Sequence, residues 1–258
     1  AAAVHELRLI PLGNVKAYYD LEDLKTAIEY DKNGFYYDSG LGTVVIENPV
    51  RRVQNRFVPI ENIREISTFC REKGLKLHLD GARLHIAAAF SGVSVEEYAS
   101  YFDTVYISLY KYLNAGGGAI LCGDSDIIEK MEHQIKILGG SILRNWTSTA
   151  MALHYLAEVD QRWAQVVERS QKLIQELNNM DGLKIWALEN GSNSHRMSLS
   201  DQIDPEALSE QLYLRNILWS PARKDEESFF FVVNDTMLLG SHGAIINAWS
   251  ESIVLAKG

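Results

Sequence analysis

Residues 75–83 read Leu-Lys-Leu-His-Leu-Asp-Gly-Ala-Arg, a short apolar run that ends in an acid and a small-residue turn. The run Leu75–Leu79 has the length and apolar bounds of a buried strand. Asp80 then lies at the carboxyl end of that strand, where open α/β sheets place their ligands. A helix N-cap is the alternative interpretation of Asp80, because acids commonly begin helices.

A lysine follows the next strand in a similar position. Thr104–Ser108 is predicted to be a strand, Lys111 comes three residues after it, and Gly116-Gly117-Gly118 follows. A lysine just beyond a buried strand, in an aromatic setting, suits imine chemistry, whereas a solvated surface charge is the alternative. Asp80 and Lys111 could reach one crevice, and pyridoxal phosphate (PLP) needs this pair: a lysine for its aldehyde and a carboxylate for its ring nitrogen.

Strands and helices alternate through the first half of the chain, which predicts right-handed βαβ crossovers and a mainly parallel sheet. Apolar runs typical of strands and apolar residues at helical spacing distinguish the two kinds of element. The predicted strands are Leu7–Ile10, Thr43–Ile46, Leu75–Leu79, Thr104–Ser108 and Ala119–Cys122, and the predicted helices are Leu21–Tyr30, Pro59–Lys73 and Arg83–Phe90.

The pattern changes after about residue 140. Trp146–Asn178 is predicted to form one or two long helices. The rest alternates as strand, strand, helix, strand and helix: Leu183–Leu188, Arg196–Ser200, Pro205–Leu214, Phe229–Val233 and Ala244–Ala256. We therefore predict two domains, a large one over residues 1–155 and a small α+β domain over residues 156–258.

Composition excludes several classes of protein. The 258 residues are 47% hydrophobic and carry a formal charge of −9, so attraction to a nucleic-acid backbone is not expected. The sequence has no apolar run of about 18 residues, so a membrane span is not expected. Cys70 and Cys122 are predicted to be buried free thiols, which fits a reducing cytoplasm. The five tryptophans are interpreted as packing residues.

Three segments resemble the threonine aldolase and β-eliminating lyase family of fold-type I PLP-dependent enzymes. They are Leu77–Leu84, with Asp-Gly-Ala-Arg; Val105–Lys111, whose lysine follows Asp80 by 31 residues; and the glycine-rich, arginine-bearing run Lys136–Arg144. The resemblance covers most of residues 7–160. It implies an α/β fold with a mainly parallel sheet, flanking helices and a smaller C-terminal α+β domain.

The resemblance also implies roles for individual residues. Lys111 would be the Schiff-base residue, and Asp80 the partner of the pyridine nitrogen. Arg83 would donate to the phenolic oxygen of the cofactor. Ser108 would contact the phosphate, or would only cap the strand end. Arg144 would reach a phosphate or a substrate carboxylate, in its own subunit or across a subunit interface, or would be a surface arginine.

The activity implied by the resemblance is that of a lyase which cleaves a small, threonine-like β-hydroxy-α-amino acid to glycine and an aldehyde, in a homodimer or homotetramer. Two alternatives remain. One is another fold-type I reaction, β-elimination or transamination, because these reactions share the lysine and the acid. The other is a non-catalytic fragment that keeps only the fold.

The sequence also departs from the family's pattern. Family members are longer at the N-terminus, so we expect this chain to lack their phosphate-binding turn and ring-stacking aromatic residue. Glu47-Asn48-Pro49-Val50 stands where many threonine aldolases have Glu-Asn-Thr-His. Arg51 or Arg52 could bind a substrate carboxylate there, although adjacent loop arginines are commonly solvated.

Arginines of the C-terminal part and two histidines near Asp80 are further candidate site residues. The family's C-terminal carboxylate-binding arginine has no clear match near Phe229–Asp235, which leaves Arg196 and Arg223 as candidates. His78 and His85 flank Asp80, but their spacing is not that of metal ligands, so no metal site is predicted.

Overall fold

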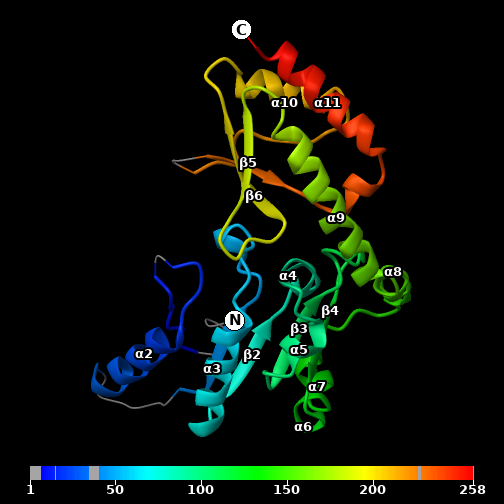
Figure 1. The fold of residues 1–258 in the computed structure, drawn as a ribbon. Coiled ribbons are helices and arrows are strands. Elements are labelled where there is room, and N and C mark those ends of the chain that lie inside the picture. The colour runs from blue at the N-terminus through cyan, green and yellow to red at the C-terminus, as the bar shows by residue number, and fades with distance from the viewer. Residues whose placement is uncertain (1–6, 15, 35–40, 226–227, 258) are drawn as a thin grey trace.

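Two β-sheets organise the molecule, and the long helix α9 (Val159–Leu177) runs from the larger sheet to the smaller one (Figure 1). The computed structural model describes residues 7–14, 16–34, 41–225 and 228–257. The larger sheet holds the predicted site and is built from the first half of the chain.

The larger sheet has the strand order β1-β2-β3-β4. Its strands are β1 (Thr43–Glu47), β2 (Lys76–Asp80), β3 (Thr104–Ser108) and β4 (Ala119–Gly123). The first three are parallel, whereas β4 is antiparallel to β3. Ile46, Leu79 and Val105 are register partners in neighbouring strands, and all three are buried. The apolar alternation of these strands therefore sets the register that places their carboxyl ends side by side.

Helices α2 (Leu21–Gly34), α3 (Ile60–Glu72), α4 (Leu84–Ser91) and α5 (Val95–Ala99) belong to this half of the chain. Asp20 accepts a hydrogen bond from the amide of Asp23, which caps the start of α2. Ile63 and Ile66 of α3 are fully buried in the core beneath the sheet. Helix α3 ends before Gly74, whose φ of +67° suits a residue without a Cβ.

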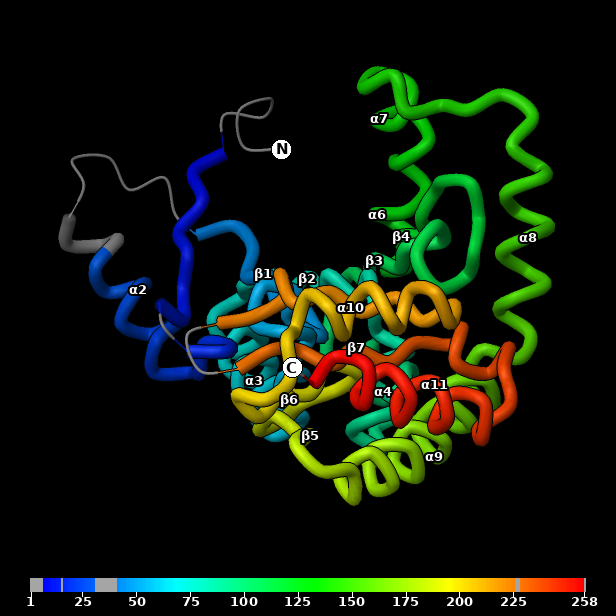
Figure 2. Tube along the Cα trace, turned by 90° about the horizontal axis from the view of Figure 1, so that it is seen from above, coloured from blue at the N-terminus to red at the C-terminus, as the bar shows by residue number. Residues whose placement is uncertain are grey.

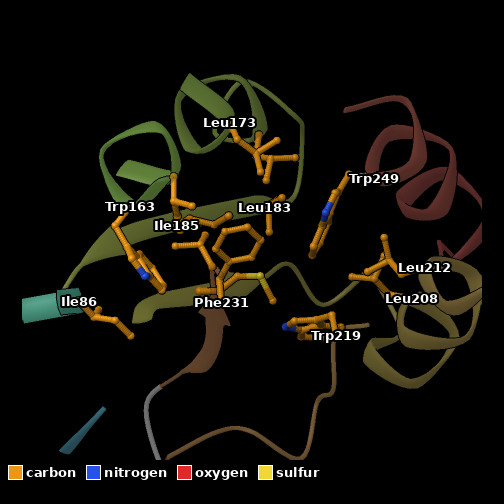
Figure 3. Close-up of a cluster of buried hydrophobic side chains, with 14 of the residues drawn as sticks. Ile86, Trp163, Leu173, Leu183, Ile185, Leu208, Leu212, Trp219, Phe231 and Trp249 are labelled. Carbon is orange, nitrogen blue, oxygen red and sulfur yellow. The ribbon is translucent and has the colours of Figure 1, made fainter. Parts of the chain in front are cut away.

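The smaller sheet is antiparallel, in the order β5-β6-β7. It consists of β5 (Leu183–Ala187), β6 (Ser194–Leu199) and β7 (Phe229–Val232), and it packs with α9, α10 (Pro205–Tyr213) and α11 (His242–Leu255). Figure 3 shows the core between these elements, where Phe231 lies between Trp163 and Trp249.

The N-terminal half, which forms the larger sheet, and the C-terminal half, which forms the smaller sheet, share a core and a polar contact. Ile86 of α4 is fully buried in the same cluster as Trp163 of α9 (Figure 3). On another side, Asn55 Nδ2 donates to Asn193 Oδ1 at 3.0 Å, and the amide of Phe57 donates to the carbonyl of Asn190 at 2.8 Å. The loop that follows β1 is thereby attached to the loop that precedes β6.

Helices α6 (Ser125–Ile128), α7 (Met131–Ile137) and α8 (Trp146–Leu156) extend away from the sheets (Figure 2). Two short 3₁₀ helices, η1 (Arg51–Val53) and η2 (Asp235–Leu238), complete the elements used below. None of the helices in the described residues is long and apolar enough to cross a bilayer.

The structure corrects several predictions. Residues 7–10 lie outside any strand in the described segment 7–14, because an apolar run alone does not supply a pairing partner. Cys122 is exposed rather than buried, since the described residues leave both faces of β4 largely uncovered. Trp146 and Trp186 are 70% and 38% exposed and are not buried packing residues, whereas Trp163, Trp219 and Trp249 are buried as expected. The short helices α5, α6 and α7 were not predicted.

The long helical region is two helices, because α8 ends at Leu156 and α9 begins at Val159. The predicted division into residues 1–155 and 156–258 stays a prediction.

Candidate active site at the ends of β2 and β3

Asp80 is the last residue of β2, and backbone bonds on both sides fix it. Its carbonyl accepts from the amide of Asn48 at 3.0 Å, and the next amide, that of Gly81, donates to the carbonyl of Tyr106 at 2.9 Å. Its side-chain Oδ1 accepts from the amide of Ala82 at 3.2 Å. The helix α4 begins later, at Leu84, so Asp80 closes a turn at the strand end and is not the N-cap of the helix.

Gly81 lets this turn approach β3 closely. A Cβ at this position would lie 3.0 Å from the carbonyl oxygen of Tyr106 and 3.2 Å from the Cβ of Leu84. Such distances are shorter than ordinary van der Waals contact, so any side chain would push the turn away from β3. The glycine of the Asp-Gly-Ala-Arg run is therefore a packing requirement.

Lys111 lies in a closed loop between β3 and β4. The amide of Leu109 donates to the carbonyl of Gly118 at 3.1 Å, and the amide of Ala115 donates to the carbonyl of Leu109 at 3.1 Å. Leu113 is 1% exposed and anchors the loop in the core. Lys111 itself is partly exposed, and its Nζ lies 5.3 Å from the ring centroid of Tyr110.

Ser108 and two tyrosines form a polar group before this lysine. Ser108 is 3% exposed, and its Oγ donates to Tyr106 Oη at 3.1 Å. Tyr110 is 49% exposed. A hydrogen bond with Ser108 and the positive charge of Lys111 lower the pKa of Tyr110. Hydroxyl groups thus accompany the lysine at this edge of the sheet.

The two predicted arginines lie in different places. Arg83 is partly buried and directly precedes α4, at the end of the turn that Asp80 begins. Arg144 is exposed, with a left-handed φ of 58°, on the connection between α7 and α8. The glycine turn packs beside that connection, because a Cβ on Gly118 would lie 3.9 Å from Asn145 Nδ2.

The structure therefore brings Asp80, Arg83, Ser108 and Lys111 to the carboxyl ends of two neighbouring parallel strands, or just beyond them. Arg144 is on a segment that borders the turn after Lys111. None of the roles given to these residues is tested by the geometry alone, so the roles stay predictions.

Of the other candidate arginines, three are exposed and one is held in an ion pair. Arg51 and Arg52 follow the carboxyl end of β1 in η1, and both are exposed. Arg196 is ion-paired with Asp225, at 3.0 Å between Nη2 and Oδ2. Arg223 is exposed. Because Arg196 is already paired with Asp225 within the C-terminal half, it is a weaker candidate for binding a substrate carboxylate.

The two histidines make hydrogen bonds to side chains. His78 Nδ1 lies 2.8 Å from Thr104 Oγ1, and burial lowers the pKa of His78. His85 Nδ1 lies 3.2 Å from Asp160 Oδ1 of α9. Among the described residues, no group of three His, Cys, Asp or Glu side chains is arranged to hold a metal ion.

Sequence reasoning missed the contacts that position the lysine loop. Arg162 of α9 donates to the carbonyl of Tyr112, at 3.1 Å, and Tyr112 packs edge-on against Trp163 with 5.4 Å between ring centroids. The buried Asn48 accepts from the amide of Val58 at 2.9 Å and holds the loop after β1. No motif marks Arg162, because its partner is 50 residues away along the chain.

A mainly parallel sheet with an acid and a lysine at adjoining strand ends, followed by a small antiparallel domain, defines the fold-type I class of PLP-dependent enzymes. Solved structures share the fold. A putative L-allo-threonine aldolase from Listeria monocytogenes aligns with a TM-score of 0.76 at 22% identity, over 97% of this chain and 70% of that one. A Leishmania major threonine aldolase aligns with a TM-score of 0.67 at 17% identity, over 93% of this chain and 68% of that one.

The family model described as beta-eliminating lyase matches residues 1–199, and the chain belongs to that family. The low-specificity L-threonine aldolase of Candida albicans is 41% identical over 137 residues, which is 53% of this chain and 36% of that protein. The corresponding enzyme of Saccharomyces cerevisiae is 30% identical over 194 residues, 74% of this chain and 48% of that protein. The chain thus spans about half the length of these relatives, or less.

Proposed function

We propose that this chain carries the cofactor-binding core of a PLP-dependent lyase that cleaves a threonine-like β-hydroxy-α-amino acid to glycine and an aldehyde. The observation that supports this proposal most strongly is the placement of Asp80 at the end of β2 and of Lys111 just beyond the end of the neighbouring parallel strand β3. The names of the relatives, which are low-specificity L-threonine aldolases, point to the same substrate class.

The groups at this edge fit PLP chemically. The carboxylate of Asp80 suits a protonated pyridine nitrogen, and the amine of Lys111 suits the aldehyde carbon. Arg83 would donate to the phenolic oxygen, and Ser108 would donate to the phosphate when it releases Tyr106. When bound, PLP supplies a ring that accepts the electrons left on Cα after the bond between Cα and Cβ breaks.

The residues of the chain then have separate tasks. Asp80 would hold a proton at the pyridine nitrogen, since its carboxylate is fixed by the turn to Ala82. Lys111 would bind the aldehyde carbon and give way to the amine of the substrate. Arg144 would bind a phosphate or a substrate carboxylate. Its exposed position on the α7–α8 connection suits a role in the crevice of a neighbouring subunit.

We also propose a homodimer or homotetramer. The segment from α7 to α8 exposes many apolar side chains, and Figure 2 shows these helices standing away from the sheets. The set comprises Ile135, Ile137, Leu138, Ile142, Leu143, Trp146, Met151, Leu153 and Leu156, each between 38% and 89% exposed. Apolar surface gathered in this way typically marks an interface, and a second copy would also bring its Arg144 to this surface.

A reducing compartment such as the cytoplasm fits the two free thiols, one buried and one exposed.

The function is tested by adding PLP and measuring both the visible absorption of the bound cofactor and the products from L-threonine, L-allo-threonine and L-serine. Glycine and acetaldehyde are expected from the first two. Pyruvate or 2-oxobutyrate would instead establish β-elimination, and an oxo acid formed with a second amino acid would establish transamination. Absence of cofactor absorption would favour the non-catalytic alternative. Lys111→Ala should abolish the absorption, whereas the exposed Lys130→Ala should keep it.

A further inference from the structure

Arg162 joins three separate segments through one guanidinium group. Its Nη2 donates to the carbonyl of Tyr112 at 3.1 Å, directly after Lys111. Its Nη1 donates to the carbonyl of Tyr155, at 3.1 Å, in the last turn of α8. Its Nε lies 3.2 Å from Asp235 Oδ2 of η2 and forms an ion pair. The lysine loop, the end of α8 and the C-terminal half therefore meet at this side chain.

The surroundings of Arg162 are largely shielded from solvent. Its side chain is 17% exposed and that of Asp235 is 22% exposed. The guanidinium carbon also lies 5.2 Å from the ring centroid of Tyr155. Charge-assisted hydrogen bonds in such a setting are stronger than those at an open surface, and the planar fork of arginine serves several acceptors at once.

The first turns of α9 also contact the segment that follows Asp80. Asp160 Oδ1 lies 3.2 Å from His85 Nδ1 of α4, and Ile86 of α4 is buried in the cluster that contains Trp163. One helix end thus touches α4, which follows Asp80, and also the loop that carries Lys111. Figure 1 shows α4 beside the lower end of α9.

We propose that Arg162 is a positioning residue that sets the main chain next to Lys111 and couples it to the C-terminal half through Asp235. This inference rests on the proposed function, because it assigns a role in presenting Lys111 to PLP. The carbonyl that Arg162 binds belongs to Tyr112, the residue directly after Lys111, so a shift of the main chain at Tyr112 is passed through one peptide unit to the Cα of Lys111. Small misplacements of a reacting group have large effects on its chemistry.

A simpler role would be general stabilisation, and α9 itself offers the control. Arg169 lies two turns further along the same helix and donates to the carbonyl of Gly240 in the C-terminal half. It makes the same kind of bond to a backbone carbonyl, but that carbonyl, of Gly240, is far in sequence from the lysine loop. Arg162→Met and Arg169→Met therefore remove matched guanidinium groups, and only the first frees Tyr112.

The first measurement is amide hydrogen exchange of the protein without cofactor, over residues 109–118. We expect exchange at the amides of Leu109 and Ala115 to rise about tenfold or more in Arg162→Met, the effect of losing one charge-assisted hydrogen bond. Arg169→Met should leave this loop unchanged and raise exchange only near Gly240. Equal exchange of the loop in both variants would overturn the proposal.

The second measurement is PLP titration, followed by the visible absorption of the bound cofactor. We expect Arg162→Met to weaken binding about tenfold or more, Asp235→Asn to weaken it less, and Arg162→Lys to restore part of the loss, because lysine keeps the charge without the fork. An affinity of Arg162→Met for PLP equal to that of the wild-type protein would overturn the proposal.

Failure of the proposed function has a different signature. If the wild-type chain shows no cofactor absorption, the function fails, whereas the hydrogen-exchange comparison still decides whether Arg162 positions the loop. If Arg162→Met does not fold, Asp235→Asn takes its place, because it removes the ion pair that holds the guanidinium group and leaves the donors of Arg162 unchanged. A loop exchange unchanged in Asp235→Asn would then overturn the coupling to the C-terminal half.

Discussion

Asp80 and Tyr106 are register partners on the parallel strands β2 and β3, and the amide after Asp80 donates to the carbonyl of Tyr106 at 2.9 Å. This pairing ties the acid to the strand that leads to Lys111 five residues later. The spacing between the ends of β2 and β3, from which Asp80 and the loop of Lys111 follow, is therefore set by ladder hydrogen bonds.

The carboxylate of Asp80 can be tested by an isosteric change. Asp80→Asn keeps an oxygen that can accept from the amide of Ala82, so the turn should remain. It removes the charge that would keep the pyridine nitrogen protonated, and we expect cleavage of threonine to fall by about 100-fold or more. Steady-state rates with saturating PLP measure the effect. The exposed Asp201→Asn is the control, and a wild-type rate in Asp80→Asn would contradict the assignment.

The close approach at Gly81 predicts a specific loss of stability. Gly81→Ala places a Cβ 3.0 Å from the carbonyl of Tyr106, so the turn or β3 must shift. We expect a cost of about 1–3 kcal/mol in the free energy of unfolding, as for other overpacked sites. Denaturant unfolding measures it. Gly117→Ala has nothing within 4 Å of its Cβ and should be nearly neutral, and equal effects in the two variants would refute the explanation.

His195 of β6 predicts a pH dependence of stability. It is 9% exposed, its Nδ1 has no hydrogen-bond partner within the described part of the chain, and burial lowers its pKa to about 4. In the unfolded state His195 binds a proton as the pH falls through about 6.5, whereas in the folded state it stays neutral until about pH 4. The contribution of His195 is therefore fully present above pH 6.5 and is lost as the pH falls from 6.5 to about 4.

The expected loss over this window is about 3 kcal/mol in the free energy of unfolding. Denaturant unfolding at a series of pH values measures it, and the apolar His195→Leu should flatten the profile. His242→Leu is the control and should keep the wild-type fall between pH 6.5 and 4, because His242 is more exposed and pairs with Glu176 at 2.9 Å. A profile of His195→Leu that still falls by the wild-type amount between pH 6.5 and 4 would show that His195 is not responsible.

The exposed apolar segment predicts the assembly state. Leu143 is 89% exposed between α7 and α8, and we expect Leu143→Glu to place a charge in the interface and dissociate the oligomer. Light scattering after size-exclusion chromatography measures the mass. Leu218→Glu changes a residue that is 87% exposed in the C-terminal half and should leave the mass unchanged. A wild-type protein that is monomeric at all concentrations would exclude the proposed interface.

The sequence by itself determined the parts of the fold whose signals are local. Alternating and continuous apolar runs gave the strands of the larger sheet to within one or two residues, because a strand that is buried on its faces must be apolar along its own length. The Asp-Gly-Ala-Arg run and the lysine beyond Ser108 predicted that Asp80 and Lys111 follow the carboxyl ends of neighbouring strands, since strand ends in a parallel sheet share one side.

The tertiary structure alone decided what depends on distant neighbours. Residues 7–10 have strand composition but pair with no strand in the described part of the chain. Cys122 is exposed because the described residues leave both faces of β4 largely uncovered. The contact of Arg162 with Tyr112 joins residues 50 positions apart, through a helix that packs across both halves of the chain. Such contacts arise from the packing of whole elements, which no local pattern encodes, and they set where Lys111 is held.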